Sequence, residues 1–125
     1  MNLCFVDSSR SNPFARQLFA ALATELEGLG VAVTQTEDEF PPHSQGVVYV
    51  VVPNEYFENT VQELHPSRQQ LRNTIALSLA PPGLLSHESD FRRGRECRAM
   101  MDVSPVGVLD LRRRGVPARR LTPCG

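Results

Sequence analysis

The chain has 125 residues, of which 41% are hydrophobic and 22% are charged, and its formal net charge is −1. This length is typical of one domain, and this composition is typical of a folded globular protein, not of a disordered one. A net charge so close to zero gives no overall attraction to nucleic acid or to a membrane surface. No apolar run approaches the length of a membrane span, so we expect neither a nucleic-acid partner nor a membrane span.

The basic residues and the cysteines indicate the source and compartment of the chain. All 13 basic residues are arginine, which we interpret as the codon usage of a GC-rich bacterial genome. Cys4, Cys97 and Cys124 are odd in number and have no short spacing, so they predict neither a disulfide framework nor a zinc site. Asp7 and Arg10 interrupt the apolar start, so no signal peptide is predicted and we expect a cytoplasmic location.

The first half of the chain alternates strand and helix patterns. Pro13 suits the first position of a helix whose leucines recur at helical period until Gly28. Residues 37–45 are acidic and contain two prolines, which predicts a loop. The strands expected in this half cover residues 3–6, 31–34 and 47–52. The last of these is a run of β-branched and aromatic residues, typical of a central strand buried on both faces.

The second half continues the alternation. Residues 54–73 are mixed and contain one short capped helix. The strands expected here cover residues 74–79, 99–103 and 118–121. The helices expected here run from Ser67 to Leu71, from Ser86 or Ser89 to about Arg98 with a weak apolar stripe, and from Ser104 to Gly115.

This alternation predicts one Rossmann-like α/β domain over residues 1–125, with three layers and a mostly parallel sheet of about five to six strands. In such a sheet, ligands bind at the carboxyl ends of strands near a switch in strand order. Asp7 and Glu55 are the candidate catalytic bases. The candidate ligand-binding residues are Asp7, Ser8, Ser9, Arg10, Asn12, Asn54, Glu55, Tyr56 and Ser104.

Each candidate also has a structural alternative. Asp7 can form a turn, and the serines and Asn12 that follow it can cap the helix. The ring of Tyr56 can pack in the core instead of stacking on a ligand. The three histidines are expected in loops and none has the spacing of a metal site, so no metal or cofactor is predicted. They are His43, His65 and His87.

The opening stretch contains the spacing of a phosphate-binding catalytic loop, because five residues separate Cys4 from Arg10 and Ser11 follows. Such a loop needs the cysteine at the end of a strand and N–H groups that curl inward, usually with glycine. Here Phe5 and Val6 continue the strand beyond Cys4, and the loop has no glycine. No aspartate precedes a proline, as it does in low-molecular-weight tyrosine phosphatases. A small cysteine-phosphatase-like enzyme is therefore the last of three hypotheses for the function, and the other two follow.

Three stretches, FVDSSRSNPFARQL, VVYVVVPNEYF and VLDLRRRGVPARRL, lie in order over nearly the whole chain. Together they resemble the N-terminal domain of bacterial glycosyltransferases of the two-domain GT-B architecture. In those relatives the middle strand tends to end in Pro-His-Glu followed by Phe or Tyr. This chain has Asn54 in place of that histidine, and an asparagine cannot act as a base near neutral pH. Any catalytic role of that position is therefore lost.

The resemblance implies a Rossmann-like half whose loops face a small-molecule acceptor across a cleft, while a second half binds the nucleotide-sugar. The chain ends about where the linker to that half would begin. We therefore expect acceptor recognition by a domain that is catalytically incomplete and inactive alone. That acceptor-recognition domain is the first hypothesis. The second is a non-enzymatic Rossmann-like module that binds a partner protein or forms a homodimer. Its contact surface would be the one that the second Rossmann-like half covers in the two-domain relatives.

Overall fold

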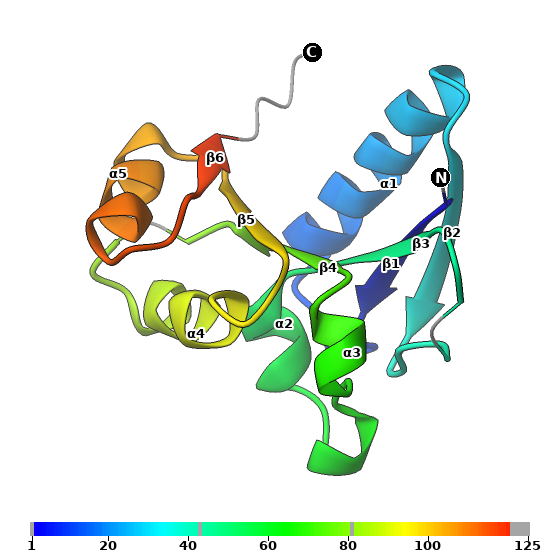
Figure 1. The fold of residues 1–125 in the computed structure, drawn as a ribbon, viewed down its shortest axis with the longest axis horizontal. Helices are drawn as coiled ribbons and strands as arrows, with labels where there is room; N and C mark the ends of the chain where they lie inside the picture. Colours follow the sequence, from blue (N-terminus) through cyan, green and yellow to red (C-terminus); the bar gives the residue numbers. More distant parts are fainter. Residues whose placement is uncertain (1, 43, 81, 121–125) are drawn as a thin grey trace.

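The computed structural model describes residues 2–42, 44–80 and 82–120, and a fully parallel sheet forms the centre of this part of the chain (Figure 1). The strand order is β2-β1-β3-β4-β5-β6. This is one of the two common doubly wound orders with one further strand. The predicted α/β class with a parallel sheet is confirmed. The strands are β1 (Asn2–Asp7), β2 (Ala32–Glu37), β3 (Val47–Val51), β4 (Thr74–Ser78), β5 (Ala99–Asp102) and β6 (Arg119–Arg120).

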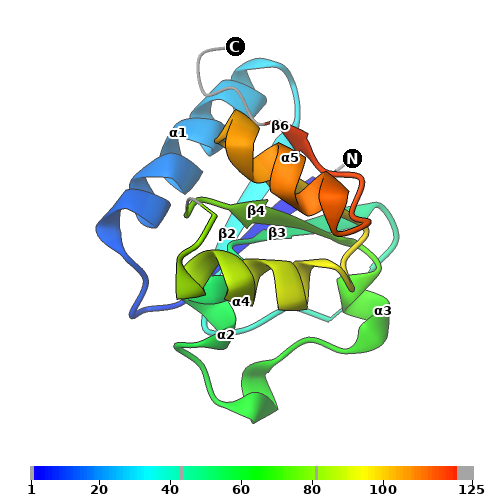
Figure 2. The ribbon, with the colours of Figure 1, turned by 90° about the vertical axis from the view of Figure 1, so that its left-hand side faces the viewer.

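Helices cover both faces of the sheet, so the fold has the three expected layers (Figures 1 and 2). On one face, Phe19 and Ala23 of the first helix pack against β1 and β3. On the other face, Tyr56, Phe57 and Leu111 of later helices join the core. The helices are α1 (Pro13–Gly28), α2 (Pro53–Phe57), the 3-10 helix η1 (Gln62–Leu64), α3 (Arg68–Leu71), α4 (Leu85–Gly94) and α5 (Pro105–Arg113).

Strand β3 is buried on both faces, as its run of β-branched residues predicts. Val48 and Val50 belong to the core beneath α1, while Tyr49 and Val51 belong to the core beneath α2. All four are at most 8% exposed. The hydroxyl of Tyr49 donates to the carbonyl oxygen of Pro41 at 2.7 Å, so this buried polar group is satisfied. Strand β3 therefore lies between β1 and β4 as an interior strand.

The strands at the two edges of the sheet differ from their predicted bounds. Strand β2 extends to Glu37, where a loop was predicted. It lies at the edge of the sheet and most of its residues are exposed, so its polar second half carries no apolar signal. At the other edge, β6 comprises Arg119 and Arg120. The predicted end of that strand, Leu121, lies outside the described residues.

The prediction for α4 is wrong at both ends and for the histidine it contains. The helix begins at Leu85 and not at Ser86 or Ser89, and no side chain caps it. It ends at Gly94, earlier than predicted. His87, which was expected in a loop, is fully buried within this helix.

Pairing of the following strand explains why α4 is short. The backbone N–H of Arg98 donates to the carbonyl oxygen of Thr74 at 2.9 Å, so the chain is already aligned with β4 at this point. Strand β5 then begins at Ala99. A helix continuing to residue 98 would leave no chain to make this turn.

Helix α5 begins above a buried carboxylate. Ser104 is the predicted N-cap, and its side chain accepts the N–H of Gly107 at 3.4 Å. Asp102, the last residue of β5, is fully buried and accepts the N–H of Ser104 at 2.8 Å. Gly107 has no side chain, and the Asp102 carboxylate occupies the space where one would lie.

We predict that Gly107→Ala destabilises the fold. An added Cβ would lie 2.5 Å from the carboxyl carbon of Asp102, so the helix or the carboxylate must shift. Such overpacking costs about 1–3 kcal/mol, which urea unfolding followed by circular dichroism would measure. Gly28→Ala is the matched control, because no atom lies within 4 Å of a Cβ added there. Equal stability of the two variants would contradict the close packing of Asp102 against α5.

Candidate functional site

The strand order reverses between β1 and β3, and the carboxyl ends of both strands meet at this point. Strand β2 lies on the outer side of β1, whereas β3 and the later strands lie on the other side. In open parallel sheets, ligands bind outside the carboxyl ends of the strands at such a reversal. A hydrogen bond links the two connections here, because the N–H of Asn12 donates to Oε2 of Glu55 at 2.9 Å.

A cavity of about 330 Å³ opens beside the reversal. This volume lies at the lower end of the range for small-molecule sites, about 300–1,000 Å³. Its walls come from the start of α1, the ends of β3 and β4, and α4. We call it the carboxyl-edge cavity; its lining includes Phe14 and the polar residues Asn12, Asn54, Glu55, Ser86 and Asp90. The structure thus brings together three of the predicted site residues.

Asp90 is the buried acid of this cavity. It is 1% exposed, and its Oδ1 accepts the N–H of Asn54 at 2.6 Å. Burial raises the pKa of Asp90 to about 7, although the Asn54 N–H, the Ser78 hydroxyl and the charge of His87 oppose the rise. A carboxyl group with a pKa near 7 gains and loses a proton at neutral pH, which suits general acid–base chemistry.

In the loop between β1 and α1, side-chain oxygens of the protein accept the backbone N–H groups. The N–H of Ser8 donates to Oδ1 of Asp7 at 2.9 Å, and the N–H of Ser9 donates to Oδ1 of Asp38 at 3.0 Å. The N–H of Arg10 donates to Oγ of Ser8 at 3.1 Å. A phosphate-binding loop points such N–H groups at its ligand, whereas here protein oxygens already accept them.

Other predicted site residues lie outside the carboxyl-edge cavity. Ser9 and Arg10 line a separate cavity of about 400 Å³. Asp7 lies beside Arg16 in a cavity of about 270 Å³ between α1 and β2. Ser104 caps α5, and the fully buried Ser8 belongs to the loop described above. The predicted residues are therefore divided among several places along the carboxyl edge.

Tyr56 and Asn12 adopt the structural alternatives considered for them. Tyr56 is fully buried, and its hydroxyl donates to the carbonyl oxygen of Leu64 at 2.6 Å. Its ring packs edge-to-face against Phe57, with 5.6 Å between centroids. Burial raises the pKa of Tyr56 to about 12, which keeps this hydroxyl protonated. Asn12 caps α1 by accepting the N–H of Phe14 at 2.7 Å, while still lining the carboxyl-edge cavity.

Cys4 lies inside strand β1 and not at its end. It is 3% exposed and packs in the core with Tyr49 and Val51. Its sulfur lies 3.9 Å from Oγ1 of Thr36 on the neighbouring strand. The thiol is therefore enclosed by the sheet and α2 and does not face the loop that contains Arg10.

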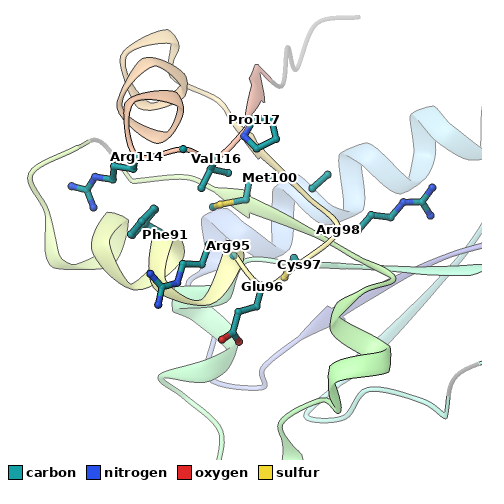
Figure 3. Close-up of a pocket in the computed structure, with 12 residues that line it drawn as sticks. Phe91, Arg95, Glu96, Cys97, Arg98, Met100, Arg114, Val116 and Pro117 are labelled. Atoms are coloured by element: carbon teal, nitrogen blue, oxygen red, sulfur yellow. The ribbon is translucent and has the colours of Figure 1, made fainter.

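A further cavity, of about 390 Å³, opens at the opposite, amino-terminal edge of the sheet near the ends of α4 and α5 (Figure 3). Phe91, Met100 and Val116 lie around it, and the side chains of Arg95 and Arg114 extend away from its centre. Burial raises the pKa of the Cys97 thiol there to about 12, so this thiol is a poor nucleophile. The chemistry-bearing groups are instead at the carboxyl edge.

Sequence reasoning missed Asp90 and Ser86, because both lie on α4. The buried face of that helix includes His87, Asp90 and Gly94, at spacings of three and four residues. Helical spacing of ionisable residues, in place of an apolar stripe, is the signal that could have identified this helix as part of a site.

The fold and the cavity define a class of protein, an open parallel α/β domain with a ligand-sized cavity at the carboxyl edge of its sheet. Among family models, characterised proteins and solved structures, no match to this chain was found.

Within residues 2–42, 44–80 and 82–120, no group of three or more His, Cys, Asp or Glu side chains is arranged to hold a metal ion. No helix in that part of the chain is both long and apolar enough to cross a bilayer.

We predict that Asp90→Asn stabilises the protein at pH 8. Folding raises the pKa of this carboxyl from 3.8 to about 7, so the folded state binds more protons than the unfolded state between these values. The contribution of Asp90 to the free energy of unfolding is therefore fully present below pH 3.8 and is lost as the pH rises toward and through 7. The amide cannot ionise, so urea unfolding should show a gain on the order of 4 kcal/mol at pH 8 and little change near pH 3.5.

Asp38→Asn is the control for this experiment. Hydrogen bonds from Ser9 lower the pKa of Asp38, so its contribution to stability is lost as the pH falls and not as it rises. Asparagine also tolerates the positive φ of 58° at this position. Stabilisation of both variants at pH 8 would indicate general relief of negative charge and would contradict a specific effect of burial at Asp90.

We also predict that iodoacetamide does not modify Cys4 in the folded protein at pH 7, because the thiol is buried within β1. Peptide mass spectrometry would detect the modification, and protein unfolded in urea provides the control in which Cys4 reacts. Rapid modification of Cys4 in the folded state would contradict its burial and would instead support the cysteine-phosphatase hypothesis.

Proposed function

We propose that this chain is a glycosyltransferase-type acceptor-binding domain, whose carboxyl-edge cavity binds a small molecule through its hydroxyl groups. The observation that carries the proposal is the pair of carboxyl groups, Glu55 and Asp90, that line one cavity beside Asn12 and Asn54. Carboxylate and amide side chains both exchange hydrogen bonds with hydroxyl groups. Phe14 adds an aromatic ring that is 58% exposed, as the ligand-stacking face of a sugar site requires.

Asp90 is the base in this proposal. Its pKa of about 7 suits removal of a proton from an acceptor hydroxyl as that oxygen attacks a donor sugar. The backbone N–H of Asn54 fixes the carboxylate at 2.6 Å. Asn54 occupies the position where the resemblance leads us to expect a histidine. Asparagine cannot accept a proton from a ligand near neutral pH. In this proposal the adjacent carboxylate of Asp90 accepts that proton instead.

Glu55 positions the acceptor. One of its carboxylate oxygens accepts the N–H of Asn12, which fixes the side chain across the strand reversal. A carboxylate has several lone-pair directions, so a ligand hydroxyl can donate to the same group. The binding energy of such a charge-assisted hydrogen bond is about 1.5–3 kcal/mol.

In this proposal the nucleotide-sugar donor binds outside the carboxyl-edge cavity. The described residues that line the carboxyl-edge cavity include no basic side chain to neutralise a diphosphate. Donor binding therefore needs a second domain or chain, and this chain alone is catalytically incomplete. Under the same proposal, the protein is a bacterial, cytoplasmic one.

A bare part of the sheet favours the alternative function, a non-enzymatic module that pairs with a partner or with a second copy. Ile75, Leu79 and Met101 are half-buried on the face that α1 covers, and Ala99 is exposed. Figure 1 shows α1 near β1 and β3, with β5 and β6 farther from it. Such an apolar face is typical of a surface that another body covers.

Saturation-transfer NMR would test the acceptor-binding proposal. We expect signal transfer to at least one of three probes, methyl α-D-glucopyranoside, N-acetylglucosamine and phenyl β-D-glucopyranoside, and none to UDP-glucose. Glu55→Gln should weaken that binding about tenfold, because a neutral amide accepts a hydroxyl proton less strongly. It should leave the fold intact, because the amide oxygen still accepts the N–H of Asn12.

The matched control is Glu37→Gln, which changes a carboxylate at the same edge that lines a different cavity. It should bind the probes as the wild type does. Equal losses in both variants, or no transfer to any of the three probes, would count against acceptor binding. A stable dimer in light scattering together with no transfer would favour the alternative.

A further inference from the structure

Helices cover the half of the sheet formed by β4, β5 and β6 on one face only. On that covered face, Ala76 and Met100 pack with Leu111 of α5. Helix α1 lies on the opposite side of the sheet, where it packs over β1 and β3 (Figures 1 and 2). The described helices after α1 contribute to the cores of the covered face. The α1 side of β4, β5 and β6 therefore has no helix of its own among the described residues.

The strand registers identify the side chains on this uncovered side. Ile75 of β4 pairs with Ala99 of β5, and Met101 of β5 pairs with Arg119 of β6. Paired residues of neighbouring strands point to the same side of a sheet. Ile75, Met101 and also Leu79 belong to the core beneath α1, so the set points to the α1 side. We call it the bare face: Ile75, Leu79, Ala99 and Met101, with Arg119 at its margin.

The bare face has room for one helix. Ala99 is exposed, and Ile75, Leu79 and Met101 are only half-buried. Neighbouring strands lie about 4.8 Å apart, so β4 and β5 together are about 10 Å wide, which is also about the diameter of a helix. A single helix beside α1 would therefore cover these side chains.

The outward side of α1 has the character of a contact surface. The outer side of a solvated helix is typically charged. Between Arg16 and Glu25, however, the exposed residues of α1 carry no charge, and they are Gln17, Ala20, Ala21 and Thr24. At the two ends of the helix, Phe14 is 58% exposed and Leu29 is 79% exposed. This side of α1 is therefore suited to pack against another apolar surface.

One flank of α1 is turned toward the bare face. Phe14 lines the carboxyl-edge cavity together with Leu79 at the end of β4. Leu18 and Leu22 follow at intervals of four residues, so they lie on the same flank, and both are half-buried. Glu25 comes three residues after Leu22, at the upper margin of this flank. The leucine flank and the bare face are thus two sides of one apolar surface.

The charges at the amino-terminal edge of the sheet are complementary. Helix α1 ends there with Glu25 and Glu27 and has no basic residue in its last turn, although this end of a helix favours a cation. Arg98 is exposed directly before β5, and Figure 3 shows its side chain extending toward the side on which α1 lies. Within the described residues none of the three forms a salt bridge.

We propose that the bare face is the contact surface of a homodimer, in which α1 of each copy lies on the bare face of the other. A twofold axis along the strands gives both copies the same contacts. The two α1 helices then run parallel, with Leu18 and Leu22 of each copy against each other. The small side chain of Ala21 packs on Met101 of the partner subunit.

The same arrangement brings the complementary charges together. Because α1 ends at the amino-terminal edge in both copies, Glu25 of one copy meets Arg98 of the partner subunit. At the other edge, Phe14 of one copy lies beside Leu79 of the partner subunit, next to the carboxyl-edge cavity. The second copy thus helps to enclose that cavity. This homodimer goes beyond the proposed function and does not depend on acceptor binding.

Sedimentation velocity of the full chain in reducing buffer would test the homodimer. We expect a dimer that Ala99→Arg weakens by at least about tenfold, because a long charged side chain on the bare face would hold α1 of the partner away. Ala99 is exposed, so the variant should fold as the wild type does. Leu109→Arg is the matched control, because it adds the same charge on α5, where Leu109 is 54% exposed, and it should leave the dimer unchanged.

An exchange of charges would test the arrangement of the two copies. Arg98→Glu and Glu25→Arg should each weaken the dimer, and a chain that carries both changes should regain most of the lost affinity, because opposite charges face each other again. Glu25→Arg places a cation at the end of α1, which favours the helix. A loss of dimer in that variant is therefore not caused by unfolding.

Three results would overturn the homodimer. They are a monomer at the concentrations used for NMR, which would leave the bare face to a partner of another sequence, a dimer that Ala99→Arg does not weaken, and no recovery in the doubly changed chain. If the dimer behaves as expected and the cavity binds no acceptor, the homodimer stands and acceptor binding alone is wrong. If a monomer binds an acceptor, the homodimer is wrong and acceptor binding stands.

Discussion

Hydrogen bonds from backbone N–H groups to carboxylates hold the carboxyl edge of the sheet in place. The first N–H groups of a helix have no partner within the helix, and a parallel sheet brings several such starts to one edge. Each connection described there uses an acidic side chain as the acceptor. The donor and acceptor pairs are Ser8 with Asp7, Ser9 with Asp38, Asn12 with Glu55, Asn54 with Asp90, and Ser104 with Asp102. The positions of the site residues depend on these bonds.

The same kind of bond leads to opposite acid strengths at different depths. At accessible Asp38, hydrogen bonds from Ser9 outweigh desolvation, and the pKa falls. At Asp90 and Asp102, desolvation outweighs the N–H bond, and the pKa rises. One edge of the sheet therefore presents a strong acid to solvent and a weak acid to the cavity. Separation of acid strengths within a small space is what general acid–base chemistry requires.

Local patterns in the sequence predicted the elements whose stability is local. The valine run of β3, Pro13 at the start of α1 and the Ser67 cap were all predicted, and Ser67 forms a reciprocal capping box with Gln70. Helix α4 was misplaced because its buried face is polar. Asp90 receives its hydrogen bond from a residue 36 positions away, and His87 meets a carboxylate 23 positions away. Periodicity cannot reveal such distant partners, so the cavity acid was missed while Glu55 and Asn54 were found.

The hydrogen bond between Asn12 and Glu55 has a further consequence for recognition. It joins the connection after β1 to the connection after β3, so one wall of the carboxyl-edge cavity cannot move freely without the other. A cavity whose walls are linked before a ligand arrives loses little conformational freedom when the ligand binds. Discrimination among ligands then depends on shape and on the placement of their hydroxyl groups, and less on how much of the protein each ligand can order.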